Sequence, residues 1–323
     1  MKTGILTFHA AKNYGAVLQC RCLYEVLKSL GHEVSVIDYR PDYLIEPYKL
    51  WKRSFLRHPG TVLKVSARIA GALRRDAAFD SFIDEMALEP VDGSSFDAIF
   101  YGSDQIWNRN ICRGIDPMFY AGAPLAAMTR NIAYAASDGN IIPSAEEQKV
   151  VRRYLHNFHR IGVREEAMLE RMDEEGIPAV LNLDPVMLAG AEVLDGICAP
   201  PVCKEGYVLT YEAIDNPAVL DKARRIASEK HLKVIAVSRT PYSGGTNKYG
   251  PKEFVALFRD AAKVVTTSYH GVVLSILFNK DYEYVRTNTP ADGRIDSLLA
   301  ALDKKGIDAL RAQSLDFIKE ALS

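Results

Sequence analysis

The chain has 323 residues, of which 48% are hydrophobic and 25% are charged, and its formal net charge is −1. This length exceeds what a single hydrophobic core usually supports, so we expect two domains. The composition excludes a disordered chain, and the near-neutral charge argues against nucleic acid as the main partner.

The five cysteines are an odd number and show no paired spacing of the kind that metal sites use. We expect them to be free thiols in a reducing compartment, and we expect no bound metal. The N-terminus enters a strand-like segment directly, and no apolar run approaches the roughly 18 residues of a membrane span. These features predict a cytoplasmic protein.

The first half of the chain alternates strand-like and helix-like patterns. Residues 2–8 favour a strand, residues 16–30 carry a helical pattern that Gly31 closes, and residues 33–39 favour a second strand. This βαβ unit predicts a parallel sheet. Further strands are expected at 97–101, 131–136, 160–163 and 179–183, with helices at 144–156 and 165–175.

A stretch without periodicity, residues 190–204, is the predicted linker between an N-terminal domain of residues 1–189 and a C-terminal domain of residues 205–323. Strands are expected after it at 206–211, 233–237 and 264–267, and helices at 217–230, 251–262 and 272–278. The predicted fold class is therefore α/β. Two Rossmann-like domains with a site in the cleft between them form the layout called GT-B.

Residues 47–75 contain eight Lys or Arg residues and no Asp or Glu. If this segment is helical, Arg57, Lys64, Arg68 and Arg75 share one face. Such a face is either simply solvated or a peripheral contact with anionic lipid or a lipid-diphosphate sugar, and both interpretations stay open.

Several separated motifs follow the predicted strands. They occupy residues 5–9, 13–19, 101–108, 134–137, 163–165, 183–186 and 267–276. In the order and spacing of these motifs the chain resembles the polysaccharide pyruvyl transferases. The resemblance implies a GT-B-like fold and transfer of a pyruvyl group from phosphoenolpyruvate to a sugar of a cell-surface polysaccharide or its lipid-linked precursor. It also implies that phosphoenolpyruvate is the donor substrate and that no metal or nucleotide takes part.

The chain departs from the family pattern at two places. Ser268 stands two residues before the motif histidine, where some branches have an arginine. One cation expected near the donor is therefore missing or supplied elsewhere. Asp138 follows Ser137 where many relatives have an aromatic residue, which affects the shape of that loop.

The donor side is predicted at the end of the strand at 264–267. His270 is the first choice for general acid/base catalysis, although a histidine at this place can also be a buried structural residue. Ser268, Tyr269 and Gly271 are expected to contact the donor, with Gly271 letting the backbone approach a phosphate or merely opening the helix. Arg164 is predicted to bind the donor carboxylate or phosphate, the alternative being an ion-paired helix start.

The acceptor side is predicted in the loop after the strand at 97–101. Asp104 is the second expected catalytic residue, because a carboxylate at a strand exit has little structural work there. Gln105 and Asn108 are expected to bind sugar hydroxyls, and Trp107 is either a stacking platform for the sugar or a core residue.

The first strand-to-helix turn also belongs to the predicted acceptor side. Asn13 and Tyr14 lie in it, and the absence of a Gly-x-Gly-x-x-Gly pattern argues against a dinucleotide. Asn13 is equally suited to cap the helix. Asp184, before Pro185, is interpreted as structural, and His9 is left unassigned.

Two other functions stay open from the sequence. One is a GT-B glycosyltransferase that uses a nucleotide sugar, and the other is a non-catalytic glycan-binding relative. The sequence does not indicate the acceptor sugar or the oligomeric state.

Overall fold

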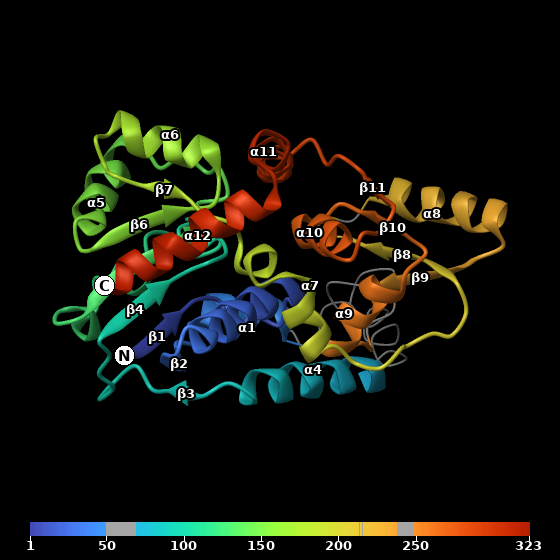
Figure 1. The fold of residues 1–323 in the computed structure, drawn as a ribbon, viewed down its shortest axis with the longest axis horizontal. Coiled ribbons are helices and arrows are strands. Elements are labelled where there is room, and N and C mark those ends of the chain that lie inside the picture. Colours follow the sequence, from blue (N-terminus) through green and yellow to red (C-terminus); the bar gives the residue numbers. More distant parts are fainter. Residues whose placement is uncertain (50–68, 213, 215, 238–247) are drawn as a thin grey trace, which may run out of the picture.

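We analysed a computed structural model, which describes residues 1–49, 69–212, 214, 216–237 and 248–323 (Figure 1). Its first sheet has seven strands in the order β3-β2-β1-β4-β5-β6-β7, and all six pairings are parallel. The strands are β1 (Lys2–Leu6), β2 (Glu33–Ile37), β3 (Leu88–Glu89), β4 (Ala98–Tyr101), β5 (Arg130–Ala136), β6 (Arg160–Val163) and β7 (Val180–Leu181). The central strands are apolar on both faces because helices cover the sheet on both sides.

The second sheet has four parallel strands in the order β11-β10-β8-β9. They are β8 (Tyr207–Tyr211), β9 (Lys233–Val237), β10 (Lys263–Thr266) and β11 (Tyr282–Tyr284). The expected α/β fold with two parallel sheets is confirmed, and it has the GT-B-like arrangement.

Helices connect the strands of each sheet. Those of the first half are α1 (Tyr14–Ser29), α2 (Asp42–Ile45), α4 (Ile69–Asp84), α5 (Ala145–Leu155) and α6 (Glu166–Glu174), with short 3-10 turns η1 (Glu46–Tyr48), η3 (Pro117–Tyr120) and η4 (Pro124–Ala126). Those of the second half are α7 (Pro185–Ile197), α8 (Pro217–Lys230), α9 (Pro251–Asp260), α10 (Tyr269–Leu277), α11 (Pro290–Lys305) and α12 (Ile307–Leu322). None of the described helices is long and apolar enough to span a bilayer.

The predicted linker is wrong as far as Ile197, because α7 continues to that residue. Gly190 breaks the helix with a φ of 80°, which hides the periodicity in the sequence. Leu194 and Ile197 are nevertheless buried in the core, so the second half of α7 is held by packing.

The last helix, α12, does not stay with the second sheet as the domain prediction placed it. Ser314 accepts a hydrogen bond from the backbone of Leu183 (3.0 Å), and Glu320 pairs with Arg160 (2.8 Å). Figure 1 shows α12 crossing back over the first sheet, so that both chain ends lie on that side of the molecule.

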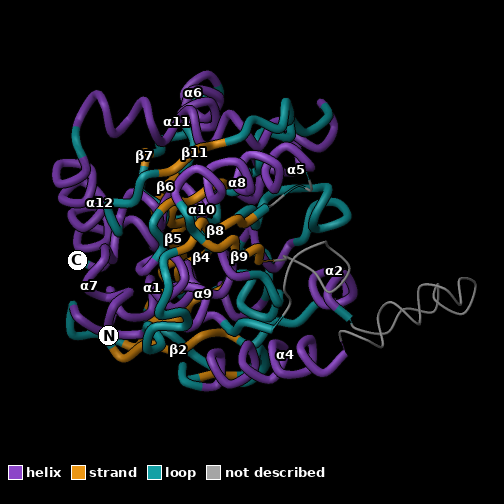
Figure 2. The backbone as a smooth tube through the Cα atoms, turned by 90° about the vertical axis from the view of Figure 1, so that its right-hand side faces the viewer, coloured by secondary structure: helices purple, strands orange, loops and turns teal. Residues whose placement is uncertain are grey.

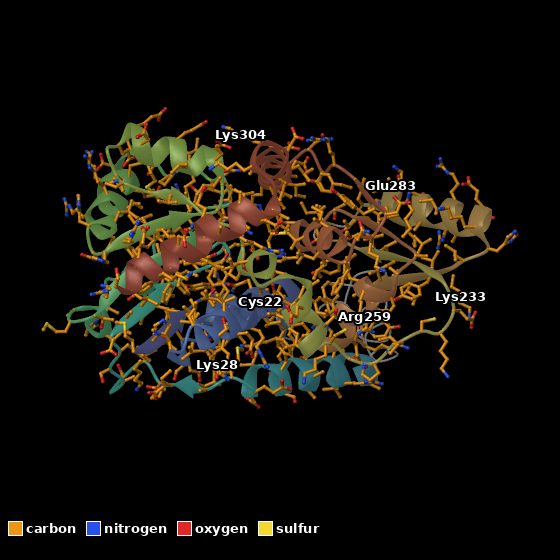
Figure 3. All side chains as sticks on the ribbon, viewed as in Figure 1. Cys22, Lys28, Lys233, Arg259, Glu283 and Lys304 are labelled. Carbon is orange, nitrogen blue, oxygen red and sulfur yellow. The ribbon has the colours of Figure 1, made fainter. Side chains whose placement is uncertain are left out.

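One cluster of buried apolar side chains joins the two halves of the chain. It includes α1, α7, α9 and α10, which lie close together in two perpendicular views (Figures 1 and 2). Cys22 on α1 lies in this interior (Figure 3), and all five cysteines are free thiols. The relative position of the two sheets is therefore set by a common core.

The basic segment at 47–75 is described only at its ends. Arg57, Lys64 and Arg68 lie outside the described residues. Arg75 is fully buried, donates to the backbone carbonyl of Lys12 (2.6 Å) and lies over the ring of Phe79. The prediction that Arg75 shares an exposed basic face is therefore wrong, since its aliphatic stem and guanidinium pack in the core.

Candidate active site

A cleft of about 560 Å³ opens where the two sheets meet. Strands β1, β4, β8 and β10 all end toward it, which is where ligands bind in open parallel sheets. Polar and aromatic groups line it from both halves of the chain: Asn13, Tyr43, Tyr48, Asp104, Gln105, Asn110, Arg113, Tyr211, Ser268, Tyr269, His270 and Arg294.

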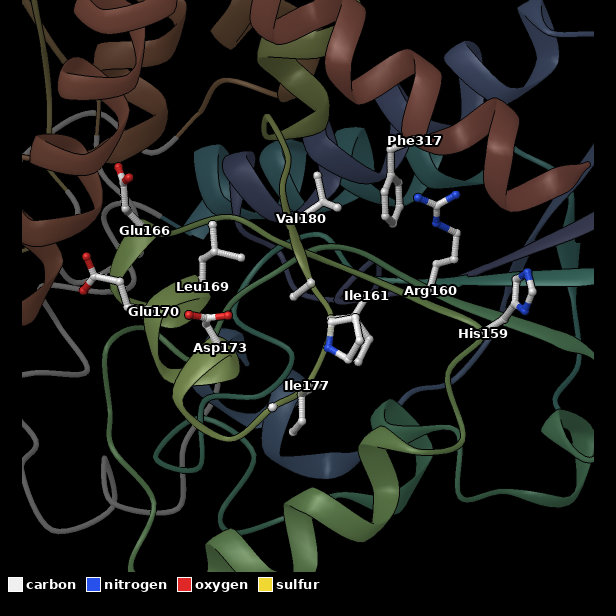
Figure 4. A pocket seen from close by; sticks show the side chains of 13 residues that line it. His159, Arg160, Ile161, Glu166, Leu169, Glu170, Asp173, Ile177, Val180 and Phe317 are labelled. Carbon is white, nitrogen blue, oxygen red and sulfur yellow. The ribbon is translucent and has the colours of Figure 1, made fainter.

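A larger hollow, of about 810 Å³, lies elsewhere, over β6, β7 and α6 (Figure 4). Glu166, Glu170 and Asp173 stand at one end of it, and Phe317 of α12 at the other. It contains none of the site residues predicted from the sequence. We therefore assign the site to the cleft between the sheets.

His270 enters the cleft from the start of α10. Ser268 caps this helix by accepting a hydrogen bond from the backbone of Gly271 (3.3 Å). The Nε2 of His270 lies 3.6 Å from Oδ2 of Asp184, an electrostatic contact longer than a hydrogen bond. Its Nδ1 faces Gly15 at the start of α1.

Asp184 is the residue at which the two halves of the site converge. It is fully buried, caps α7 through the backbone of Val186 (2.9 Å), and faces His270 as well as Nη1 of Arg164 (3.0 Å). Burial alone would raise the pKa of Asp184, but the facing His270 and Arg164 lower it to about 2. Asp184 is therefore a carboxylate at neutral pH.

Arg164 stands behind the cleft. Its guanidinium is buried and pairs with both Glu165 (3.1 Å) and Asp184 (3.0 Å), and it lies over the ring of Tyr269. The predicted direct contact with the donor is not seen in this geometry, because Arg164 is not among the cleft-lining residues and its Nε and Nη1 are engaged by these carboxylates, while the buried Nη2 has no hydrogen-bond partner. Arg164 instead holds Asp184 in place against His270.

The remaining donor-side residues divide into two groups. Ser268 and Tyr269 line the cleft as predicted. Gly271 does not, and a Cβ atom at this position would overlap the hydroxyl of Thr266 on β10. The glycine is therefore required by packing against the strand, which corrects the expectation that it admits a ligand.

The predicted acceptor residues of the loop after β4 also fall into two groups. Asp104, with a φ of 69°, and Gln105 line the cleft, and the Asp104 carboxylate accepts a hydrogen bond from the backbone of Gln105 (2.8 Å). Asn108 is buried and donates to the side chain of Gln105 (2.8 Å), so it positions Gln105 and does not line the cleft.

Trp107 is a core residue, so the prediction of a sugar platform is wrong. It is 5% exposed and stacks on Tyr120 with ring centroids 5.3 Å apart. Its indole N–H donates to the carbonyl of Phe119 (2.9 Å). Burial satisfies both the apolar ring and its single polar group.

The first strand-to-helix turn brings only one of its two predicted residues to the cleft. Asn13 lines it and also caps α1, so both interpretations of this residue hold. Tyr14 is fully buried, stacks on Phe254 at 4.0 Å and donates to the carbonyl of Tyr249 (2.7 Å). Its predicted acceptor contact is wrong because its ring joins the two halves of the core.

Four residues of the site have no functional role in the sequence-based prediction. Asp184, which the sequence analysis interprets as structural, is buried beside the cleft against His270, and its place in a motif after a strand is the signal that points to it. Arg294 lies in no motif, and its position in the cleft follows only from the path of α11. Tyr43 and Tyr48 likewise reach the cleft through the short α2 and η1 segments. His9 is buried against Asp38 (2.9 Å) and is not among the cleft-lining residues.

Among the described residues, no group of three or more His, Cys, Asp or Glu side chains is placed to hold a metal ion. The acid/base and cationic groups that line the cleft include His270, Asp104, Arg113 and Arg294.

Comparison with known families gives a match over most of the chain. The polysaccharide pyruvyl transferase profile matches residues 13–280. The chain belongs to this family. The matched region includes the cleft residues from Asn13 to His270, and it ends before Arg294.

No curated protein matches the sequence of this family member. Solved structures resemble it along their length at low identity. The UDP-N-acetylglucosamine 2-epimerase of Rickettsia bellii has 10% identity and a TM-score of 0.46, with 99% of this chain and 96% of that chain covered. The UDP-GlcNAc 2-epimerase of Methanocaldococcus jannaschii, in complex with UDP-GlcNAc and UDP, has 12% identity and a TM-score of 0.46, with 100% and 93% covered.

Proposed function

We propose that this pyruvyl transferase uses phosphoenolpyruvate to place a pyruvate ketal on a sugar of a cell-surface polysaccharide or its lipid-linked precursor. The observation that carries the proposal is the pairing of His270 with buried Asp184 at a cleft lined by the family's motifs. No metal or nucleotide cofactor is part of the proposed reaction.

The chemistry needs a proton at the methylene carbon of the donor. Protonation of this carbon makes the adjacent carbon electrophilic, and one sugar hydroxyl attacks it. The carbon–oxygen bond to phosphate then breaks. A second hydroxyl of the same sugar then closes the ketal. One of the two hydroxyl protons replaces the proton given to the methylene carbon, and the other leaves with phosphate or solvent.

His270 fits the general acid/base role because its two ring nitrogens face different surroundings. Asp184 stands opposite Nε2 and orients the ring, while Nδ1 packs against Gly15 at the start of α1. General acid/base catalysis of this kind contributes about 10²–10⁴ in rate.

The acceptor would lie at the end of the cleft formed by the loop after β4 and by α2. Asp104 is the proposed base for a sugar hydroxyl, and Gln105 and Asn13 supply hydrogen-bonding groups. Tyr43 and Tyr48 offer the apolar ring faces that sugars stack on, a role that Trp107 cannot take. A lipid-linked acceptor would also agree with peripheral membrane contact by the basic segment at 47–75, without Arg75.

Thermal shift measurements with phosphoenolpyruvate and with UDP-sugars test the donor. We expect stabilisation by phosphoenolpyruvate and release of phosphate when an acceptor sugar is present. Stabilisation by a UDP-sugar alone would support the glycosyltransferase alternative. No stabilisation by either donor would support the non-catalytic one.

A further inference from the structure

Arg294 is a cationic side chain of the cleft whose charge has no partner among the residues that the structure describes. It projects from the second turn of α11, and Ala291 of the same helix also lines the cleft. Its Nε is buried and makes no hydrogen bond. No hydrogen bond or ion pair joins Arg294 to any residue in the described ranges, although buried guanidinium groups are nearly always paired.

Glu165 and Asp104 are the carboxylates whose charges act on Arg294, and no hydrogen bond or ion pair in the described ranges joins either of them to it. Glu165 accepts at Oε1 from both Arg164 (3.1 Å) and Ser137 (2.8 Å), and its buried Oε2 has no partner. Asp104 accepts from the backbone of Gln105 (2.8 Å). Burial and the positive charge of Arg164 lower the pKa of Arg294, so its guanidinium is held in an environment that disfavours a cation.

The backbone adds to the positive potential at this place. Asn13, Ser268 and Ala291 lie at the starts of α1, α10 and α11, and all three line the cleft. The N-terminal end of a helix carries a partial positive charge, so three such ends around one cleft favour an anion.

We propose that Arg294 binds the anionic group of the donor, gripping a phosphate or carboxylate beside His270. A planar guanidinium can donate two parallel hydrogen bonds to either group. A bound anion would therefore be the partner that Arg294 lacks among the described residues. That this anion belongs to phosphoenolpyruvate rests on the proposed function. The binding role of Arg294 itself holds for any small phosphate- or carboxylate-bearing donor.

The test measures dissociation constants by calorimetry for phosphoenolpyruvate, inorganic phosphate and UDP. The variants are Arg294→Ala and Arg294→Lys. The matched control is Arg286→Ala. Arg286 is exposed, precedes α11 and pairs with Asp296, a residue of the helix that carries Arg294. We expect Arg294→Ala to weaken binding of phosphoenolpyruvate and phosphate roughly 10- to 100-fold, the size expected for hydrogen bonds to a charged group. Arg294→Lys should recover part of the loss, and Arg286→Ala should bind as the wild type does.

A melting curve without ligand distinguishes a binding role from a structural one. Because no residue of the described part of the chain pairs with this cation, Arg294→Ala should melt at the wild-type temperature or above it. A clearly lower melting temperature would overturn the proposal by showing that Arg294 holds the fold.

The binding data test the role of Arg294 and the identity of the donor independently. Equal affinity of Arg294→Ala and wild type for the anions would overturn the role of Arg294, as would failure of the wild type to bind any of them. If the wild type binds UDP but not phosphoenolpyruvate, and Arg294→Ala loses UDP, the proposed donor is wrong while the role of Arg294 is supported.

Discussion

A methyl group on Gly15 would overlap the imidazole of His270, lying only 2.8 Å from its Cγ and closer still to Nδ1. Gly15 is at the start of α1, which follows the first strand of the chain, whereas His270 is at the start of α10, which follows a strand of the second sheet. The glycine in the motif at 13–19 therefore makes room for the histidine in the motif at 267–276.

This contact predicts that Gly15→Ala will damage the site more than the fold. The added Cβ pushes His270 from its position opposite Asp184, and misplacement by about 1 Å can cost roughly 100-fold in rate. Phosphate release should fall by that order while the far-ultraviolet circular dichroism stays unchanged. The control is Gly196→Ala, since a Cβ there meets no atom within 4 Å. Equal activity of Gly15→Ala and wild type would mean that the ring position is not critical.

His270→Ala should abolish pyruvyl transfer and leave a folded protein. The side chain is 12% exposed and borders the cleft, so its removal enlarges a cavity that solvent already reaches. We expect a loss of about 10²–10⁴ in turnover with donor binding largely retained. Turnover near the wild-type rate would remove His270 from the mechanism.

Asp184→Asn should reduce both stability and activity. It leaves the buried Arg164 with one carboxylate partner instead of two, and breaking a buried ion pair typically costs about 3–5 kcal/mol. Urea unfolding measures this loss of free energy. Asp195→Asn, on an exposed position of the same helix, is the matched control and should be neutral. A variant as stable as the wild type would show that Arg164 does not need Asp184.

The pKa of Asp184 also predicts how stability depends on pH. Its folded value of about 2 lies below the ordinary 3.8, so the folded state binds this proton less tightly than the unfolded state does. The contribution is complete above pH 3.8 and is lost as pH falls toward 2. Comparing the unfolding free energy of wild type and Asp184→Asn between pH 2 and 5 isolates it, because the variant lacks this proton. Parallel curves over that range would contradict the assignment.

Tyr14→Phe tests the correction of the predicted acceptor contact. It removes the hydrogen bond to the carbonyl of Tyr249 and keeps the stacking on Phe254, so the unfolding free energy should fall by about 0.5–1.5 kcal/mol. The Michaelis constant for the acceptor should not change. A large increase in that Michaelis constant with unchanged stability would show that Tyr14 contacts the acceptor as first predicted.

The sequence by itself determined the local features of this protein. Apolar runs fixed most strands to within a few residues, and Asn13, Ser144 and Ser268 cap the helices that follow them. The strand ends that carry the motifs could be predicted to meet at one cleft because parallel strands share an edge. His270 and Asp104 were found in this way.

Only the tertiary structure decided which polar groups are free for a ligand. Trp107 and Tyr14 have side chains that suit either a core or a sugar site, and only their buried partners, Tyr120 and Phe254, decide between the two. Arg164 pairs with Asp184 at the end of the neighbouring strand, whereas Arg294 pairs with no carboxylate in the described part of the chain, and residue type alone does not distinguish the two arginines. Periodicity and caps depend on neighbours a few residues away, whereas burial and charge pairing depend on contacts between distant segments that exist only once the chain has folded.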